Sequence, residues 1–130
     1  MVKTARAVIF ENDKLLVFFR RKIIDGVEIT YYAIPGGHVE DNETLEDTCI
    51  REIKEEMNLD IELLGYLGNI RVNDCEEHYY HAKIVGGELM FGGEEFARNC
   101  YDNFYEIRWL TREEIIDSDI RALNLIKKVM

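Results

Sequence analysis

The spacing of hydrophobic positions predicts a sheet in the first third of the chain. Three short apolar runs, rich in β-branched and aromatic residues, are separated by Asn-Asp and Asp-Gly pairs that favour turns. Three later runs have the same character. The six predicted strands span residues 5–10, 15–21, 27–34, 61–67, 79–85 and 104–110.

Helical spacing replaces this pattern between residues 43 and 57. Four apolar residues recur at every fourth position and predict the buried stripe of one helix: Leu45, Cys49, Ile53 and Met57. Asp41 or Asn42 is its predicted N-cap. A last helix is predicted from Ser118 onward, where apolar residues again fall three or four apart. This order of elements predicts an α+β or α/β sandwich.

Length and composition limit the class of protein. The 130 residues fit one domain, residues 1–130, which is large enough to bury roughly two thirds of its unfolded surface. With 47% hydrophobic and 32% charged residues, the chain is typical of soluble globular proteins. Its net charge of -10 argues against DNA or an anionic membrane as the main partner, because neither is attracted to an acidic surface.

The cysteines and the N-terminal region bear on localisation. Three cysteines at irregular spacing argue against a disulfide framework and favour a reducing compartment. Glu11 and Asp13 interrupt the start of the chain before a long apolar run develops, so we expect neither a signal peptide nor a membrane-spanning helix. The sequence therefore predicts a cytoplasmic protein.

The predicted helix carries an unusual acidic cluster. At about 100° per residue, Glu52, Glu55 and Glu56 share one face, and like charges so close repel each other. A hard divalent cation would relieve that repulsion, since Mg²⁺ prefers oxygen ligands. The alternative is a solvated acidic face softened by Arg51, which stands four residues before Glu55. Two glycines in IPGGH, Gly36 and Gly37, precede the helix and would let the backbone approach an ion or a phosphate.

Residues 37–59, GHVEDNETLEDTCIREIKEEMNL, resemble the Nudix box, which has a glycine followed at fixed spacing by Glu, Arg-Glu, a Glu-Glu pair and a second glycine. The matching residues are Gly37, Glu43, Arg51, Glu52, Ile53, Glu55, Glu56 and Leu59. Asn58 stands in place of the second glycine. Because asparagine is the next most tolerant residue in the left-handed conformation that ends such a helix, we expect the turn to be kept.

This resemblance implies a fold and a reaction. The fold is an α/β/α sandwich with a mixed β-sheet between helices. The reaction is hydrolysis of a diphosphate linkage in a nucleoside diphosphate derivative or a nucleoside triphosphate, with Mg²⁺ or Mn²⁺ as cofactor. Cations suit this chemistry because adjoining phosphates repel a nucleophile until their charge is neutralised. A nucleotide is thus the implied partner, and a homodimer is a further expectation.

The resemblance also assigns metal ligands. By the match, Glu52, Glu55 and Glu56 hold the metal, and the Gly37 carbonyl and Glu40 supplement them. These oxygen donors fit Mg²⁺.

Two further box residues and a general base complete the implied catalytic site. Arg51 and Glu43 hold the loop and helix together, and Arg51 orients a ligand carboxylate. The general base is one of the two adjoining box glutamates, which we favour, or else Glu94 or Glu95 in a glycine-flanked segment.

Three residues outside the box are candidates for substrate contacts. Arg20 and Arg21 could reach a phosphate or merely flank a solvated turn, and Asn103 could read a base edge. Several aromatic residues could stack a base but are more often packed in a core: Tyr31, Tyr32, Phe104, Tyr105 and Trp109.

A zinc site in CEEHYYH was also considered. Cys75, His78 and His81 are suitable ligand types, but on a strand the two histidines point to opposite faces. We therefore do not expect one site to collect all three.

Two other functions compete with hydrolysis. The first is a Nudix-fold nucleotide sensor without turnover, since a fold is separable from its chemistry; the intact glutamates speak against it. The second is an isoprenoid diphosphate isomerase-like enzyme, for which the sequence offers no additional acid or base residues.

Overall fold

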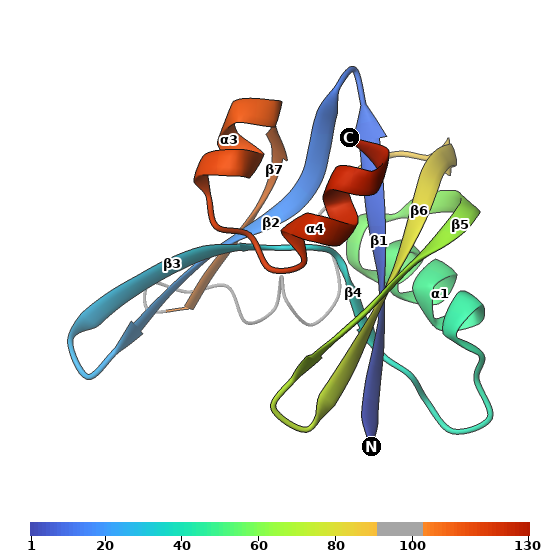
Figure 1. Cartoon of the computed structure of the whole chain (residues 1–130), viewed down its shortest axis with the longest axis horizontal. Coiled ribbons are helices and arrows are strands. Elements are labelled where there is room, and N and C mark those ends of the chain that lie inside the picture. Colours follow the sequence, from blue (N-terminus) through green and yellow to red (C-terminus); the bar gives the residue numbers. More distant parts are fainter. Residues whose placement is uncertain (91–102) are drawn as a thin grey trace.

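The computed structural model describes residues 1–90 and 103–130, and a mixed β-sheet forms its centre (Figure 1). The described strands are β1 (Val2–Glu11), β2 (Lys14–Ile24), β3 (Val27–Ala33), β4 (Gly36–His38), β5 (Leu59–Val72), β6 (Cys75–Gly87) and β7 (Asn103–Leu110). They follow the order β3-β2-β1-β6-β5, with β4 beside β1 and β7 beside β2. Only the β1–β6 pair is parallel among them, which confirms the predicted mixed sheet.

The sheet divides where β1 and β2 separate. These two strands pair only next to their turn, at Phe10 with Leu15 and Glu11 with Lys14. Farther along, β1 pairs with β4 and β6, whereas β2 pairs with β3 and β7. Figure 1 shows β1 and β2 diverging from their shared turn, with the β2–β3 hairpin extending away from the other half. The divergence leaves room for side chains to approach from both halves.

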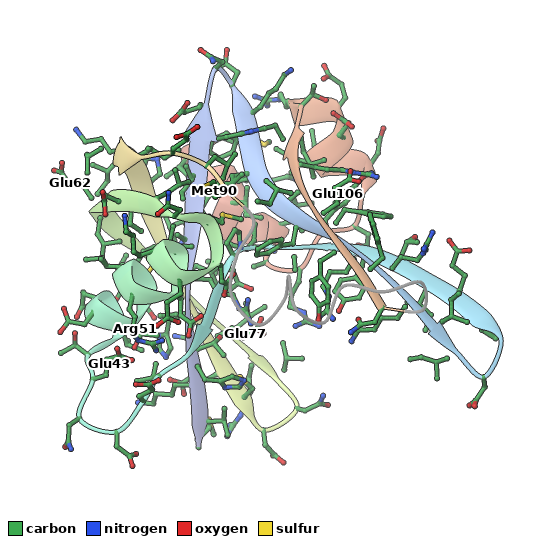
Figure 2. The ribbon with its side chains drawn as sticks, turned by 180° about the vertical axis from the view of Figure 1, so that it is seen from behind. Glu43, Arg51, Glu62, Glu77, Met90 and Glu106 are labelled. Atoms are coloured by element: carbon green, nitrogen blue, oxygen red, sulfur yellow. The ribbon has the colours of Figure 1, made fainter. Side chains whose placement is uncertain are left out.

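Helices cover both faces of the sheet, as the sandwich requires. Helix α1 (Leu45–Met57) packs on one face, and the C-terminal helices α3 (Arg112–Asp117) and α4 (Leu123–Ile126) pack on the other. Side chains along β2 alternate between the two faces of the sheet. Leu16 therefore packs in the core beneath α1, and Val17 packs in the core on the opposite face. Figures 1 and 2 show α1 and α4 on opposite sides of the sheet. No helix formed by the described residues is long and apolar enough to cross a membrane.

The start of α1 corrects one prediction. Thr44, rather than Asp41 or Asn42, is the N-cap: its backbone is extended, and its side chain accepts a hydrogen bond from the Asp47 amide at 3.1 Å. Asn42 instead has a φ of 64°, which belongs to the preceding turn. A cap needs an extended backbone that aims its side chain at the first free amides, and Thr44 provides it.

The end of α1 confirms a second prediction. Asn58 takes the left-handed conformation, with φ 59° and ψ 33°, and its backbone N–H donates a hydrogen bond to the Lys54 carbonyl. Its side chain also donates to the Glu88 carbonyl at 3.0 Å. Asparagine therefore serves where the family pattern has glycine.

The C-terminal region differs from the prediction of one helix from Ser118 onward. Asp119 and Ala122 both have positive φ, 53° and 66°, and they separate α3 from α4 and the short 3-10 turn η1 (Lys127–Val129). Helix α3 was not predicted, although Thr111 and Glu114 form a capping box at its start. The apolar spacing was real, but two left-handed residues interrupt the helix that it suggested.

Candidate active site

A cavity of about 770 Å³ lies between the end of α1, strand β4 and the divergent part of β2. Of the predicted site residues, Arg20, Gly37, Glu40, Arg51, Glu52, Glu55 and Glu56 line it. The structure thus places every predicted metal ligand, Arg51 and one of the two predicted substrate-binding arginines on the wall of one cavity. We call this space the catalytic cavity.

Glu52 and Gly37 are in direct contact at the base of this cavity. The Glu52 side chain is only 16% exposed, and its carboxylate occupies the space where a side chain on Gly37 would begin. Gly37 pairs with Ala5 of β1, so its position is fixed by the sheet. A residue without a Cβ is therefore required to seat this carboxylate.

Arg51 connects the acidic residues to one another, and Figure 2 shows it beside Glu43. Its guanidinium donates to both oxygens of Glu43, from Nε at 2.7 Å and from Nη2 at 3.0 Å. Nη1 donates to Glu52 at 2.9 Å and to Glu55 at 3.2 Å, and Nη2 reaches the His38 carbonyl at 3.1 Å. The bond to Glu43, with the nearby Glu52 charge, raises the pKa of Arg51 above its ordinary value. One cation thus orients three carboxylates.

Glu43 lies behind the cavity rather than on its wall. Besides Arg51, it accepts hydrogen bonds from the Thr48 hydroxyl at 2.6 Å and from the Glu40 amide at 3.1 Å. The Arg51 hydrogen bond and then the Thr48 hydrogen bond lower the pKa of Glu43 to about 2. These contacts tie the loop after β4 to α1. The resemblance to the Nudix box led us to expect this structural role for Glu43.

The three glutamates on α1 differ in their surroundings. Glu56 is 4% exposed, Glu52 is 16% exposed, and Glu55 is 55% exposed. Their crowding is costly for partly buried carboxylates, and Arg51 offsets part of this cost through its bonds to Glu52 and Glu55. The donor set consists of carboxylate oxygens with the backbone at Gly37, and such a set fits a hard cation such as Mg²⁺ or Mn²⁺.

The two adjacent arginines of β2 point to opposite faces. Arg20 lines the catalytic cavity, donates to the Tyr105 hydroxyl, and lies 4.0 Å from the centre of the Tyr105 ring. Asn103 is near it, with Oδ1 3.5 Å from Arg20 Nη2, but is not part of the cavity wall. Arg21 lies over the Phe104 ring on the other face. Arg20 and Tyr105 therefore lie on the wall of the cavity, and Arg21 does not.

The wall residues that were not predicted from the sequence include Arg6, Phe18 and His38. Arg6 donates to the Ile34 carbonyl at 2.9 Å and so holds the crossing between the two halves of the sheet. A single arginine inside the apolar run TARAVIF was the available signal. Trp109, by contrast, packs against the α1 core.

The remaining candidates lie elsewhere. His78 is held between the Tyr66 hydroxyl at 2.7 Å and Glu76 at 2.6 Å. In the described ranges no three His, Cys, Asp or Glu side chains converge to hold a metal ion, and this applies to the glutamates of α1 as well as to the candidate zinc ligands. Glu52 and Glu55 are instead hydrogen bonded to Arg51. Glu94 and Glu95, the alternative general bases, lie outside the described residues.

Comparisons with known proteins agree with this geometry. The NUDIX domain model matches residues 1–129. The chain is 32% identical over 100 residues to an ADP-ribose pyrophosphatase of Methanocaldococcus jannaschii, covering 72% of this chain and 58% of that protein. It is 57% identical over 94 residues to an uncharacterised Nudix hydrolase of Nostoc sp., covering 68% and 56% respectively. The chain therefore spans less than two thirds of the length of either relative.

A solved structure shares the fold along nearly the whole chain. The MutT NUDIX hydrolase from Burkholderia pseudomallei aligns with a TM-score of 0.72 at 19% identity, covering 99% of this chain and 98% of that one. The chain belongs to the Nudix family, and the resemblance seen in its sequence is confirmed.

Proposed function

We propose that this protein is a Nudix-type hydrolase that cleaves a diphosphate linkage in a nucleoside diphosphate derivative or nucleoside triphosphate with a divalent metal. The proposal rests on one observation: an acidic wall and a basic wall line the same cavity. Glu52, Glu55 and Glu56 on α1 line it together with Arg20 and Tyr105. The similarity to an ADP-ribose pyrophosphatase supports the same reaction class. An arginine opposite an acidic wall suits a substrate whose phosphates bind both.

The metal would be held by Glu52, Glu55 and Glu56, with the Gly37 carbonyl and Glu40 as supplementary ligands. When bound, Mg²⁺ or Mn²⁺ would neutralise phosphate charge and lower the pKa of a coordinated water. Seating of Glu52 on Gly37 supports this assignment, because it fixes one oxygen ligand against the sheet. The intact set of carboxylates also favours an enzyme over a sensor.

Other residues of the site would position the metal ligands and the substrate. Arg51 would hold the carboxylates in place through its four-way hydrogen bonding, and Glu43 would hold Arg51. Arg20 would bind a substrate phosphate, with its guanidinium already positioned by the Tyr105 hydroxyl. We assign the general base to Glu55 or Glu56. Such positioning matters because phosphoryl transfer depends mainly on alignment and charge stabilisation.

A nucleotide panel with and without Mg²⁺ tests the proposal. Purified protein should release nucleoside monophosphate from at least one diphosphate-linked substrate, and EDTA should abolish that release. The Glu56→Gln variant should lose the activity, and Glu62→Gln, an exposed glutamate on β5, is the matched control. If no compound with a diphosphate linkage is cleaved in Mg²⁺ or Mn²⁺, the proposal is wrong.

We further propose a cytoplasmic homodimer. The free thiols of Cys49 and Cys75 support a reducing compartment. The strand register places Ile24, Val27 and Ile29 on one face of the β2–β3 hairpin, and they are 51%, 60% and 43% exposed. Contact with a second copy would cover them. Light scattering tests the dimer, and a monomer at micromolar concentration would contradict it.

A further inference from the structure

A second cavity, of about 380 Å³, adjoins the catalytic cavity. It lies between the end of β3, strand β6 and the turn that connects α3 with α4, and we call it the outer cavity. Arg6, Arg20, Ala33 and Ile34 line both cavities. The two spaces therefore meet at a pair of arginines, one from each half of the divided sheet.

Both arginines at this junction are held in place and keep a free donor. Arg6 is anchored by the Ile34 carbonyl and lies 3.6 Å from Glu77. Arg20 is anchored by Tyr105. The Nε atom of each is buried and has no hydrogen-bond partner in residues 1–90 and 103–130. Because both arginines line the two cavities, an anion between their guanidinium groups would be favourable.

Beyond Arg6 and Arg20, the wall of the outer cavity carries charges of both signs, because Arg121 lines it together with Glu77 and Asp119. Glu77, labelled in Figure 2, is 4% exposed and accepts hydrogen bonds from Tyr79 at 3.0 Å and from Arg121 at 3.1 Å. Asp119 lies at the exposed rim, and Tyr31 contributes an aromatic ring to the wall. Carboxylates repel phosphate but accept hydrogen bonds from hydroxyl groups, and aromatic rings pack against sugar or base rings.

We propose that the outer cavity binds the hydroxylated group attached to the far phosphate of the substrate, with Arg6 and Arg20 holding the phosphate between the two cavities. This inference rests on the proposed function and narrows it to nucleoside diphosphates that carry a second, sugar-like group. A nucleoside triphosphate has no such group, so it would leave the contacts with Tyr31 and Asp119 unmade. The outer cavity thus distinguishes the two substrate classes.

Asp119 allows a clean test because of its backbone. Its φ is 53°, so Asp119→Gly removes the carboxylate without imposing strain. Asp25 has a φ of 52° and lies at the turn of the β2–β3 hairpin, outside both cavities. Asp25→Gly is therefore the matched control for charge, backbone and substitution.

The measurement is calorimetric binding of ADP-ribose and of ADP in EDTA, so that nothing is hydrolysed. A hydrogen bond from a ligand hydroxyl to a carboxylate changes affinity about tenfold. We expect the wild-type protein to bind ADP-ribose about tenfold more tightly than ADP. Asp119→Gly should remove most of that preference and leave the affinity for ADP unchanged, whereas Asp25→Gly should keep it.

Three results would overturn the inference. The first is that the wild-type protein binds ADP-ribose no more tightly than ADP, or binds neither of them. The second is an equal preference in Asp119→Gly and wild type. The third is an equal loss of affinity for both ligands, since the nucleoside would then be the occupant. Hydrolysis assayed separately with Mg²⁺ distinguishes the two proposals: cleavage of triphosphates without this preference refutes only the outer cavity, and preference without any cleavage refutes only the hydrolase.

Discussion

Replacing Gly37 by alanine should separate metal binding from folding. A Cβ at this position would lie 2.5 and 2.7 Å from the two carboxylate oxygens of Glu52, whereas ordinary contact begins at 3.4 Å. Gly37 does not have a positive φ, so alanine can adopt its backbone conformation. The three heavy atoms nearest to the new methyl all belong to the Glu52 carboxylate group.

The size of the effect follows from that displacement. The carboxylate must move by about 1 Å, and a misplacement of this size in a reacting assembly can cost about 100-fold in rate. Overpacking would cost about 1–3 kcal/mol of folding stability at most, because the Glu52 side chain can rotate away from the sheet. We therefore expect kcat/KM to fall about 100-fold and Mg²⁺ affinity to fall with it, in a folded protein.

The assay compares Gly37→Ala with Gly65→Ala. A Cβ at Gly65 would meet no atom within 4 Å, and Gly65 lies in strand β5, away from the cavity. Thermal unfolding should show both variants folded, and only Gly37→Ala should lose metal-dependent hydrolysis. Activity of Gly37→Ala within threefold of the control would refute the role given to this contact.

Three more substitutions test the site and its support. Glu56→Gln should lower kcat well over tenfold with the fold kept, and near-normal turnover would remove Glu56 from the ligand set. Glu43→Gln should lower the Tm at pH 7; since the pKa of Glu43 is lowered to about 2, its stabilisation is present above pH 4.5 and is lost as the pH falls toward 2, so the Tm difference should shrink between pH 5 and pH 2. Asn58→Ala should destabilise the protein by about 1 kcal/mol in urea unfolding, because alanine is strained at a φ of 59°, whereas Asn58→Gly should not.

The sequence predicted the sheet and α1 because local pattern and tertiary packing agree there. Leu16 and Val17 alternate between two covered faces of β2, and the stripe ending at Met57 faces one core. The acidic face of α1 followed from the same periodicity, so the residues of one cavity wall could be named in advance. Their contacts with Gly37 follow from the pairing of β4 with β1, which no local pattern specifies.

The opposite wall could be predicted only in part. Arg20 and Arg21 are equivalent in the sequence, and the strand register alone decides that Arg20 faces the cavity. Arg6 was missed because its place depends on the separation of β1 from β2, a long-range property of the sheet. The last helix was mispredicted because apolar spacing does not report the positive φ of Asp119 and Ala122.

Calorimetric titration of the protein with Mg²⁺ and Mn²⁺, with ADP-ribose present, tests most directly whether a cation is what makes the glutamates of α1 tolerable. The account predicts saturable uptake by the wild-type protein, weakened at least tenfold in Glu52→Gln and unchanged in Glu62→Gln. Absence of uptake of either ion, or equal uptake by wild type and Glu52→Gln, would contradict it.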